Sequence, residues 1–260
     1  MTTEEQPSKQ NDNQSLRKRH GARNQHRHKL LIKYLLKKFP SSFCDAQNGS
    51  FPHRHVLDVA GGKGELTARM TLCHSTNVIL VDPREADIMK VFQNTVYRSL
   101  PKKWQERISA QDSKEIAKKL DERFKQLIMY FPMDGSKDLD ILKELEKSRE
   151  LLDAVENCTL MIGIHADGAT EAIVDIALHY RKPFIVVPCC VFPNLFKERM
   201  VSSYIDGKET LVPVRNHDQL CRYLANKDSH FTIETLPFEG RNIAICWDGK
   251  KRDGDIEREE

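Results

Sequence analysis

The apolar residues of this chain fall into short runs separated by longer charged stretches. Runs that are apolar nearly throughout are typical of strands buried on both faces of a sheet, and here they cover residues 56–59, 77–81, 126–131, 159–164 and 184–187. The stretches between them carry apolar residues three and four positions apart, as helices that cover a sheet do. This alternation predicts an α/β fold with a mostly parallel sheet and helices on both faces.

Two segments near the C-terminus show a different pattern. Residues 230–236 and 241–247 alternate apolar and polar positions, and a short turn with Pro237 and Gly240 separates them. Alternating segments joined in this way predict an antiparallel hairpin. Together with the buried runs, the hairpin gives an expected sheet of seven strands.

The helical pattern is clearest in residues 29–39, where Leu31, Leu35 and Phe39 recur four positions apart. We expect Pro40 to end this helix and a polar linker to follow up to residue 55. A second helix is expected to begin at residue 65, after the glycine-rich turn. Further helices are expected over residues 85–125, with a break at Pro101, and over 139–155 and 172–179. Residues 201–226 are expected to form a loop and then a helix.

Residues 29–249 of the 260-residue chain are therefore expected to form a single domain. Residues 1–28 form a polar and then basic arm, and residues 250–260 a charged tail, so we expect both ends to be disordered. No run is long enough to span a membrane, the N-terminus has no signal-peptide pattern, and no pattern specifies an oligomeric state. Seven scattered cysteines without a C-x-x-C pair indicate reduced thiols, as in a cytoplasmic or nuclear protein.

Positive charge is concentrated in residues 17–38, although the whole chain carries a formal net charge of only +3. One interpretation is that this stretch contacts RNA, because lysines and arginines that neutralise phosphates release counterions. The other is a solubilising tail or a nuclear-import patch, since a basic stretch alone does not identify a partner. The sequence leaves both interpretations open.

A glycine-rich turn after the first buried run is the best candidate for a binding site. Its sequence is D-V-A-G-G-K-G, with Asp58 before Ala60, Gly61, Gly62 and Gly64, and a helix is expected to follow. A strand, a glycine turn and a helix let the backbone approach a ligand and offer free N–H groups at the helix start. The spacing does not fit a Walker phosphate loop.

A dinucleotide fingerprint is only partly matched, because Thr67 stands where its third glycine would be. The pattern D-x-A-G-G-x-G resembles motif I of class I S-adenosylmethionine (SAM) methyltransferases, with Ala60 at a position where that family usually has glycine. The resemblance implies that SAM is the cofactor. It further implies that Gly61, Gly62 and Gly64 let its amino-acid portion approach, and that Asp58 meets its ammonium group directly or through water.

Asp82 follows the second buried run and precedes Pro83, and we expect both residues, like Ala60 of the turn, to contact the cofactor. An acidic residue at this point of a nucleotide-binding sheet accepts hydrogen bonds from both ribose hydroxyls. An ordinary turn aspartate is the alternative. Because NAD enzymes use the same acidic residue, an NAD(P)-dependent oxidoreductase remains an alternative. The missing third glycine and the terminal hairpin argue against it.

Two later segments place reactive side chains at strand ends. Residues 165–171 read H-A-D-G-A-T-E, and P-C-C with Cys189 and Cys190 follows the next run. These segments are similar to the H-x-C-G-x-A-T-D and C-C segments of a eukaryotic group that includes tRNA acceptor-stem 2′-O-methyltransferases. Asp167 replaces the usual cysteine, and the zinc-finger segments of that group are absent. The resemblance implies an RNA acceptor, with protein as the next choice.

We expect His165 to act as the general base for methyl transfer, with Asp167 as its orienter or as a substrate ligand. Cys189, Cys190 and Asn194 are expected to line the acceptor pocket. The alternatives are that His165 caps the following helix and that the thiols only pack in the core. No metal site is expected, because zinc needs about four ligands and only His165, Cys189 and Cys190 are plausible neighbours. A SAM-fold module that binds RNA or acts as a scaffold without catalysis is a further alternative.

Overall fold

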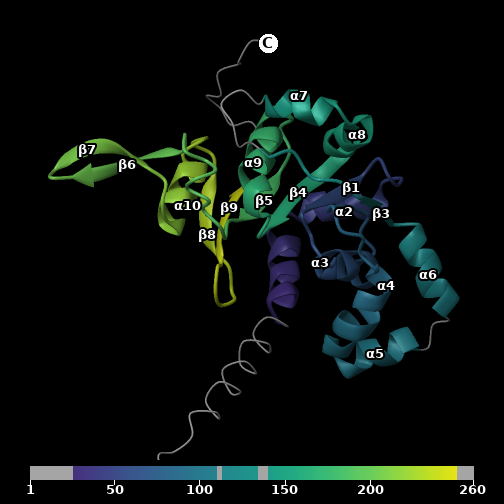
Figure 1. The fold of residues 1–260 in the computed structure, drawn as a ribbon. Helices are drawn as coiled ribbons and strands as arrows, with labels where there is room; N and C mark the ends of the chain where they lie inside the picture. The colour runs from purple at the N-terminus through teal and green to yellow at the C-terminus, as the bar shows by residue number, and fades with distance from the viewer. Residues whose placement is uncertain (1–25, 110–112, 134–139, 251–260) are drawn as a thin grey trace, which may run out of the picture.

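The structure is a computed structural model and describes residues 26–109, 113–133 and 140–250 (Figure 1). It contains a seven-stranded sheet in the order β3-β2-β1-β4-β5-β9-β8. The first five strands in the chain run parallel to one another, and β9 is antiparallel to both β5 and β8. The strand bounds are β1 (His55–Val59), β2 (Val78–Val81), β3 (Phe124–Leu127), β4 (Cys158–Ile164), β5 (Phe184–Val187), β8 (Thr232–Thr235) and β9 (Ile243–Trp247). The predicted α/β class, the mostly parallel sheet and the C-terminal hairpin are confirmed.

Strand β1 lies at the centre of the parallel part, where Val56 pairs with Val78 of β2 and with Leu160 of β4. All residues of β1, β2 and β5 are buried. Alternate side chains therefore point into two separate cores, one on each face of the sheet.

Helices cover both faces of the sheet (Figure 1). On one face lie α7 (Ile141–Glu146), α8 (Arg149–Asn157), α9 (Thr170–His179) and α10 (His217–Ala225). On the other lie the helical residues 26–38, α2 (Pro40–Asn48) and α3 (Glu65–Ala68), which continues as the π-helix η1 (Arg69–Cys73). A third cluster joins the edge of this face to α4 (Ile88–Val91), η2 (Phe92–Val96), α5 (Lys102–Ser109) and α6 (Ser113–Asp121), and the short η3 (Tyr97–Ser99) connects η2 to α5.

The helix of residues 26–38 packs on the sheet through its predicted apolar stripe. Leu31 and Leu35 are fully buried and Phe39 nearly so, which confirms the amphipathic pattern. Within the described residues the helix is present from residue 26, so its first turn precedes the domain boundary that we expected at residue 29. The polar linker expected after Pro40 was wrong, because proline is well suited to the first turn of a helix and here begins α2.

Two other predicted elements were placed wrongly. The third strand is Phe124–Leu127 rather than 126–131, because its pairing with β2 ends at Val81 and Leu127. Ile128 and Tyr130, which suggested a longer strand, are exposed. The single helix expected over 139–155 is divided into α7 and α8, since the side chain of Ser148 accepts a hydrogen bond from the Leu151 amide and begins a new helix.

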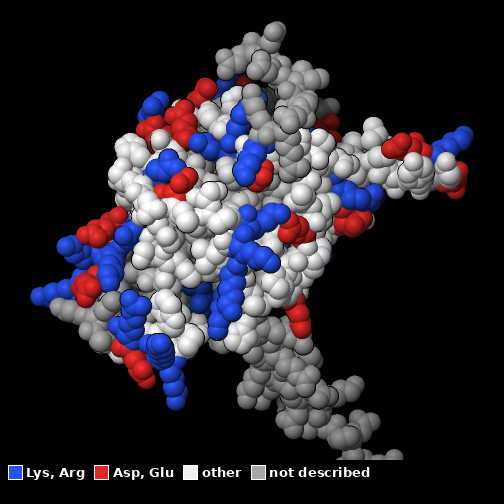
Figure 2. All heavy atoms as spheres, turned by 180° about the vertical axis from the view of Figure 1, so that it is seen from behind, with Lys and Arg blue, Asp and Glu red and all other residues white. Residues whose placement is uncertain are grey.

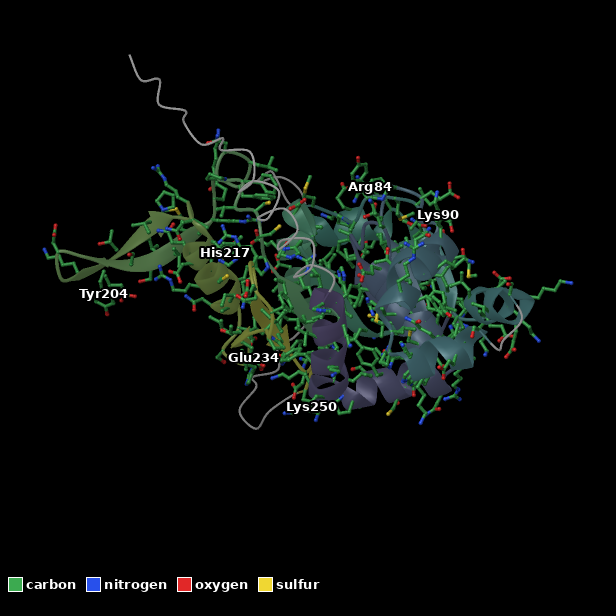
Figure 3. All side chains as sticks on the ribbon, turned by 90° about the horizontal axis from the view of Figure 1, so that it is seen from below. Arg84, Lys90, Tyr204, His217, Glu234 and Lys250 are labelled. Carbon is green, nitrogen blue, oxygen red and sulfur yellow. The ribbon has the colours of Figure 1, made fainter. Side chains whose placement is uncertain are left out.

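A hairpin of β6 (Met200–Ile205) and β7 (Lys208–Pro213) replaces the loop expected before α10. It forms a separate two-stranded sheet and projects from the body (Figure 1), with Tyr204 well away from Arg84 (Figure 3). Asp206 and Gly207 form its turn with φ of 51° and 76°, as the tight turns of hairpins require.

All seven cysteines of the chain are free. No helix among the described residues is both long and apolar enough to cross a membrane.

Candidate functional site

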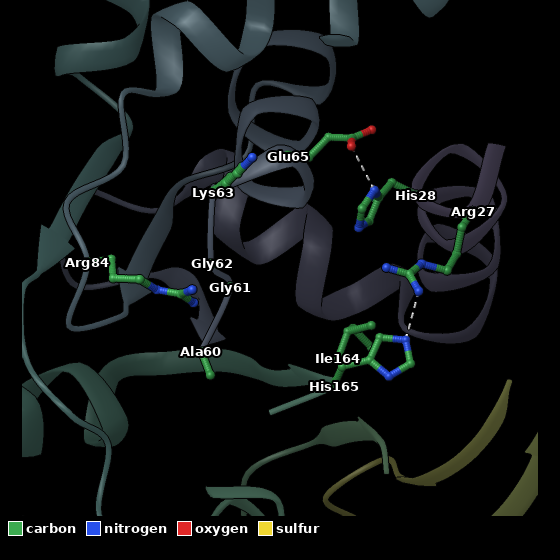
Figure 4. A pocket seen from close by; sticks show the side chains of 10 residues that line it. All are labelled: Arg27, His28, Ala60, Gly61, Gly62, Lys63, Glu65, Arg84, Ile164 and His165. Atoms are coloured by element: carbon green, nitrogen blue, oxygen red, sulfur yellow. Dashed lines mark hydrogen bonds and ion pairs between the residues drawn. The ribbon is translucent and has the colours of Figure 1, made fainter. Parts of the chain in front are cut away.

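A cavity of about 340 Å³ opens at the carboxyl ends of β1 and β4 (Figure 4). The glycine-rich turn forms one wall through residues 60–63 and Glu65, and Ile164 and His165 form another at the end of β4. Arg84 reaches in from the segment after β2, while Arg27 and His28 reach in from the N-terminal helix. Ligands bind at this edge of open parallel sheets.

The turn uses backbone conformations that favour glycine. Gly62 and Gly64 have φ of 61° and 76°, and Ala60 is also left-handed at 54°. A Cβ on Gly61 would lie 2.7 Å from Asp58 Oδ2, so this position is closed to larger residues. In the described part of the chain, the amides of Gly61 and Lys63 have no hydrogen-bond acceptor, which leaves them free for a ligand.

Asp58 lies beneath this turn, buried on β1. Its Oδ2 accepts a hydrogen bond of 2.6 Å from the hydroxyl of Thr67. Burial raises the pKa of Asp58 to about 6, an effect that outweighs the Thr67 hydrogen bond and the nearby His28. Thr67 stands where a dinucleotide fingerprint has its third glycine, and its hydroxyl is committed to this carboxyl group.

Asp82 lies at the end of β2, as predicted, and is also buried. Its carboxylate accepts a hydrogen bond of 2.9 Å from the amide of Gly62, which links it to the turn. It also accepts bonds from the amide and the guanidinium of Arg84, with Nε 3.0 Å from Oδ1. Burial alone would raise the pKa of Asp82, but these bonds hold it below its ordinary value, so the group is a carboxylate.

His165 faces the cavity at the end of β4, with a left-handed φ of 57°. Its Nε2 accepts a hydrogen bond of 2.9 Å from the guanidinium of Arg27, which is 138 residues away in the chain. Burial and the Arg27 charge lower the pKa of His165 to about 4, against the opposite effect of Asp167. The ring is therefore neutral at pH 7, and Nε2 becomes available as a proton acceptor only when Arg27 moves.

The side chain of Asp167 points toward Cys189, in a different direction from that of His165. Its Oδ1 accepts a hydrogen bond of 3.0 Å from the thiol of Cys189, whose sulfur is 3.4 Å from that of Cys190. Burial and the Asp167 hydrogen bond raise the pKa of Cys189, and Asp167 likewise raises that of Cys190. Both groups are thiols rather than thiolates, which argues against a nucleophilic role.

The potential ligand atoms of Asp167, Cys189 and Cys190 lie within 4.8 Å of one another. Sequence reasoning had considered His165 beside the two cysteines, whereas the structure places Asp167 there. Structural zinc sites have four protein ligands, and this group supplies three among the described residues.

Two other predicted site residues, Asn194 and Pro83, are not among the residues that line the cavity. Asn194 is exposed in the segment after β5, outside the residues that line the cavity. Pro83 is half-buried between Asp82 and Arg84 and contributes backbone geometry rather than a polar group. The basic residues 17–25 lie outside the described residues.

Sequence reasoning missed the cationic lining of the cavity. Arg84 follows the predicted Asp82 by two positions, and Lys63 stands inside the predicted turn, so both could have been found from their positions. Arg27 and His28 had no such signal, because they reach the cavity from a helix far away in the sequence. His28 pairs there with Glu65 at 3.0 Å.

A buried ionic group behind the site was also missed, although Glu171 belongs to the H-A-D-G-A-T-E segment. Arg199 donates a hydrogen bond of 2.6 Å from Nε to Glu171, and Lys227 and the Tyr223 hydroxyl contact the same carboxylate. Arg199 precedes β6, so these contacts hold the segment before the projecting hairpin against α9.

A scan of the chain against models of protein families gave no match, and a search of curated proteins gave none either. The assignment of a function therefore depends on the residues and the geometry of the site.

Proposed function

We propose that this protein is a SAM-dependent methyltransferase. The observation that carries the proposal is the cavity over the glycine-rich turn, with Asp82 hydrogen-bonded to that turn. A second feature supports it: β9 enters the sheet antiparallel between β5 and β8. A terminal antiparallel hairpin is the feature by which class I methyltransferases differ from dinucleotide domains, which continue with parallel strands.

The cofactor would lie along the carboxyl ends of β1 and β2. The carboxylate of Asp82 would accept hydrogen bonds from the ribose hydroxyls, which requires the exposed side chain of Arg84 to release it. The ammonium group of the cofactor would approach Asp58, and its positive charge would favour the ionised form of that carboxyl group. The free amides of Gly61 and Lys63 would bind its polar groups.

Methyl transfer from a sulfonium is an in-line displacement, so most of the acceleration comes from holding donor and acceptor in line. An acceptor hydroxyl or amide must also lose a proton. His165 would accept this proton at Nε2 after Arg27 has turned away, as a neutral imidazole. Asp167 and the two thiols would contact the acceptor from the neighbouring strand end.

We further propose RNA as the acceptor, with protein as the next choice, and the cytoplasm or the nucleus as the site of action. Among the described part of the basic stretch, Lys33 and Lys37 are exposed, whereas Lys38 pairs with Glu234 and Arg27 lines the cavity. Figure 2 shows lysine and arginine side chains across the middle of one face of the molecule, with both signs of charge mixed toward its edges. Such a face suits a phosphate backbone.

The test is calorimetric titration of the whole chain with S-adenosylhomocysteine, and with NAD and NADP in parallel. We expect micromolar binding of S-adenosylhomocysteine alone, and at least a tenfold weaker affinity in Asp82→Asn, which loses a charged acceptor. Binding of NADP alone would support the oxidoreductase, since an arginine such as Arg84 beside the ribose acid suits a 2′-phosphate. Binding of none of the three would support a module without its own cofactor.

A second assay addresses the chemistry with radiolabelled SAM and bulk tRNA. We expect methyl incorporation that His165→Ala reduces at least a hundredfold without loss of S-adenosylhomocysteine binding, because proton abstraction contributes about that much. Full transfer by His165→Ala would remove the assignment of this residue as the base.

A further inference from the structure

Arg27 is an unusual member of the cavity lining, because it brings a permanent positive charge into a partly buried position. Its guanidinium faces the cavity from the N-terminal helix, opposite Arg84 and the glycine-rich turn (Figure 4). Burial lowers the pKa of Arg27, with Glu65 and Cys189 acting in the opposite direction. A desolvated guanidinium is costly unless anionic groups or hydrogen bonds compensate it.

Glu65 compensates this cost only in part: its charge acts to raise the pKa of Arg27, but within the described residues no hydrogen bond or ion pair joins the two side chains. The Oε1 of Glu65 accepts a hydrogen bond of 2.9 Å from the buried Arg69, and its Oε2 lies 3.0 Å from His28 Nδ1. Within the described part of the chain, Arg27 Nε is buried without any hydrogen-bond partner. Its Nη1 donates to the neutral ring of His165, which carries no negative charge. Among the residues that the structure describes, Arg27 therefore has no ion-pair partner of its own.

The other cations of the cavity differ from Arg27 in this respect. Arg84 pairs with Asp82 and is largely exposed, and Lys63 is exposed to water. Arg27 is thus the cation best placed to receive an anion inside the cavity. A guanidinium binds a carboxylate in a bidentate manner, and the free amides of the turn supply further donors.

We propose that Arg27 binds the α-carboxylate of the amino-acid portion of the cofactor. The inference rests on the proposed function and adds to it a contact that the motif does not contain. The N-terminal helix then completes the cofactor site. Binding of the carboxylate also draws the guanidinium away from Nε2 of His165, so that the bound cofactor frees the proposed base.

The experiment compares SAM with decarboxylated SAM, which lacks only the carboxylate, by calorimetric titration of the whole chain. The variants are Arg27→Gln, Arg27→Lys and Lys33→Gln, the last of which removes an exposed charge from the same helix as a control. We expect the wild-type protein and Lys33→Gln to bind SAM about ten- to a hundredfold more tightly than decarboxylated SAM, as for a charge-assisted hydrogen bond.

In Arg27→Gln we expect most of this difference to disappear, since only the turn amides remain as donors, with the affinity for decarboxylated SAM unchanged within about twofold. Arg27→Lys should keep part of the difference, because lysine retains the charge but not the bidentate geometry. If Arg27→Gln weakens both ligands equally, or neither, the inference is overturned while the proposed function stands. If the wild-type protein binds neither ligand, the proposed function fails and the inference fails with it.

Discussion

Asp58 offers a sharp test of the energetics of the site, because it is a carboxyl group buried beneath a ligand cavity and forms no ion pair among the described residues. The perturbation is Asp58→Asn, which keeps the shape of the side chain and an acceptor for the hydroxyl of Thr67. The variant removes only the ability to ionise. We expect it to be more stable than the wild-type protein at neutral pH.

The magnitude follows from the pKa. Burial raises the pKa of Asp58 from 3.8 to about 6 in the folded state, so the folded protein holds a proton that the unfolded chain has released. The penalty for ionisation is absent below about pH 4, grows between pH 4 and 6, and is complete above pH 6. It amounts to about 3 kcal/mol at pH 7. Asparagine carries no such penalty at any pH.

The assay is urea unfolding of both proteins from pH 4 to pH 8, with the difference in unfolding free energy plotted against pH. Titrating groups that do not interact with Asp58 are common to both proteins and cancel in this difference, whereas His28 and Asp82 interact with it. We expect the advantage of Asp58→Asn to rise from close to zero at pH 4 to about 3 kcal/mol above pH 6. Asp121→Asn, which removes an exposed carboxylate, serves as the control. A constant advantage across the range, or a loss of stability at pH 7, would refute the reasoning.

The same variant should lose cofactor affinity if the ammonium group pairs with Asp58. A tenfold or greater loss for S-adenosylhomocysteine, together with higher stability, would identify a group kept for binding at a cost to folding. Higher stability with unchanged affinity would mean that the ammonium group binds elsewhere.

Two further predictions concern the turn and the ionic group behind the site. Ala60→Gly should stabilise the protein by about 1 kcal/mol, because Ala60 has a left-handed backbone. Gly64→Ala should destabilise it by about 2 kcal/mol or more, because the added Cβ would lie 2.3 Å from Ile88. Equal unfolding free energies for either variant and the wild type would contradict this account. Arg199→Met should cost about 3 kcal/mol, since it removes one partner of the buried Glu171. The thermal midpoint of Arg199→Met is measured by circular dichroism. A fall too small for that cost would show that Lys227 and Tyr223 are enough to stabilise the buried Glu171.

The fold could be predicted where local patterns agree with tertiary structure. The runs that became β1, β2, β4 and β5 are apolar nearly throughout because both faces of the sheet are covered, and this signal is local. The pattern failed at the edge of the sheet. Strand β3 has a partner on one side only, so its end depends on the length of β2 rather than on its own apolar residues.

The projecting hairpin was missed although its turn carried a signal. Asp206 and Gly207 adopt positive φ, and this pair of residue types is a strong indication of a two-residue hairpin turn. The strands on either side are mostly exposed, so hydrophobic alternation could not support the assignment. Without a buried face beside it, such a turn pair alone does not distinguish a hairpin from a loop.

The candidate site divides in the same way between local and distant information. The turn and Asp82 were found because residue type, spacing and backbone direction place them at one edge of the sheet. Asp82 then contacts the turn through the Gly62 amide, as a neighbouring strand end allows. The position of Arg27 in the cavity could not be predicted from the sequence, because it depends on how a whole helix packs across the sheet.

His165 and Asp167 show where motif reasoning fails even at short range. The sequence places them two positions apart and suggested one catalytic pair. Both adopt left-handed backbone conformations, with φ of 57° and 49°, and Ala166 between them is buried. The turn therefore directs His165 into the cavity and Asp167 toward the thiols of Cys189 and Cys190. Because strain of this kind persists only where surrounding contacts enforce it, the separation belongs to the fold, and in the proposed methyl transfer the two side chains would have different roles.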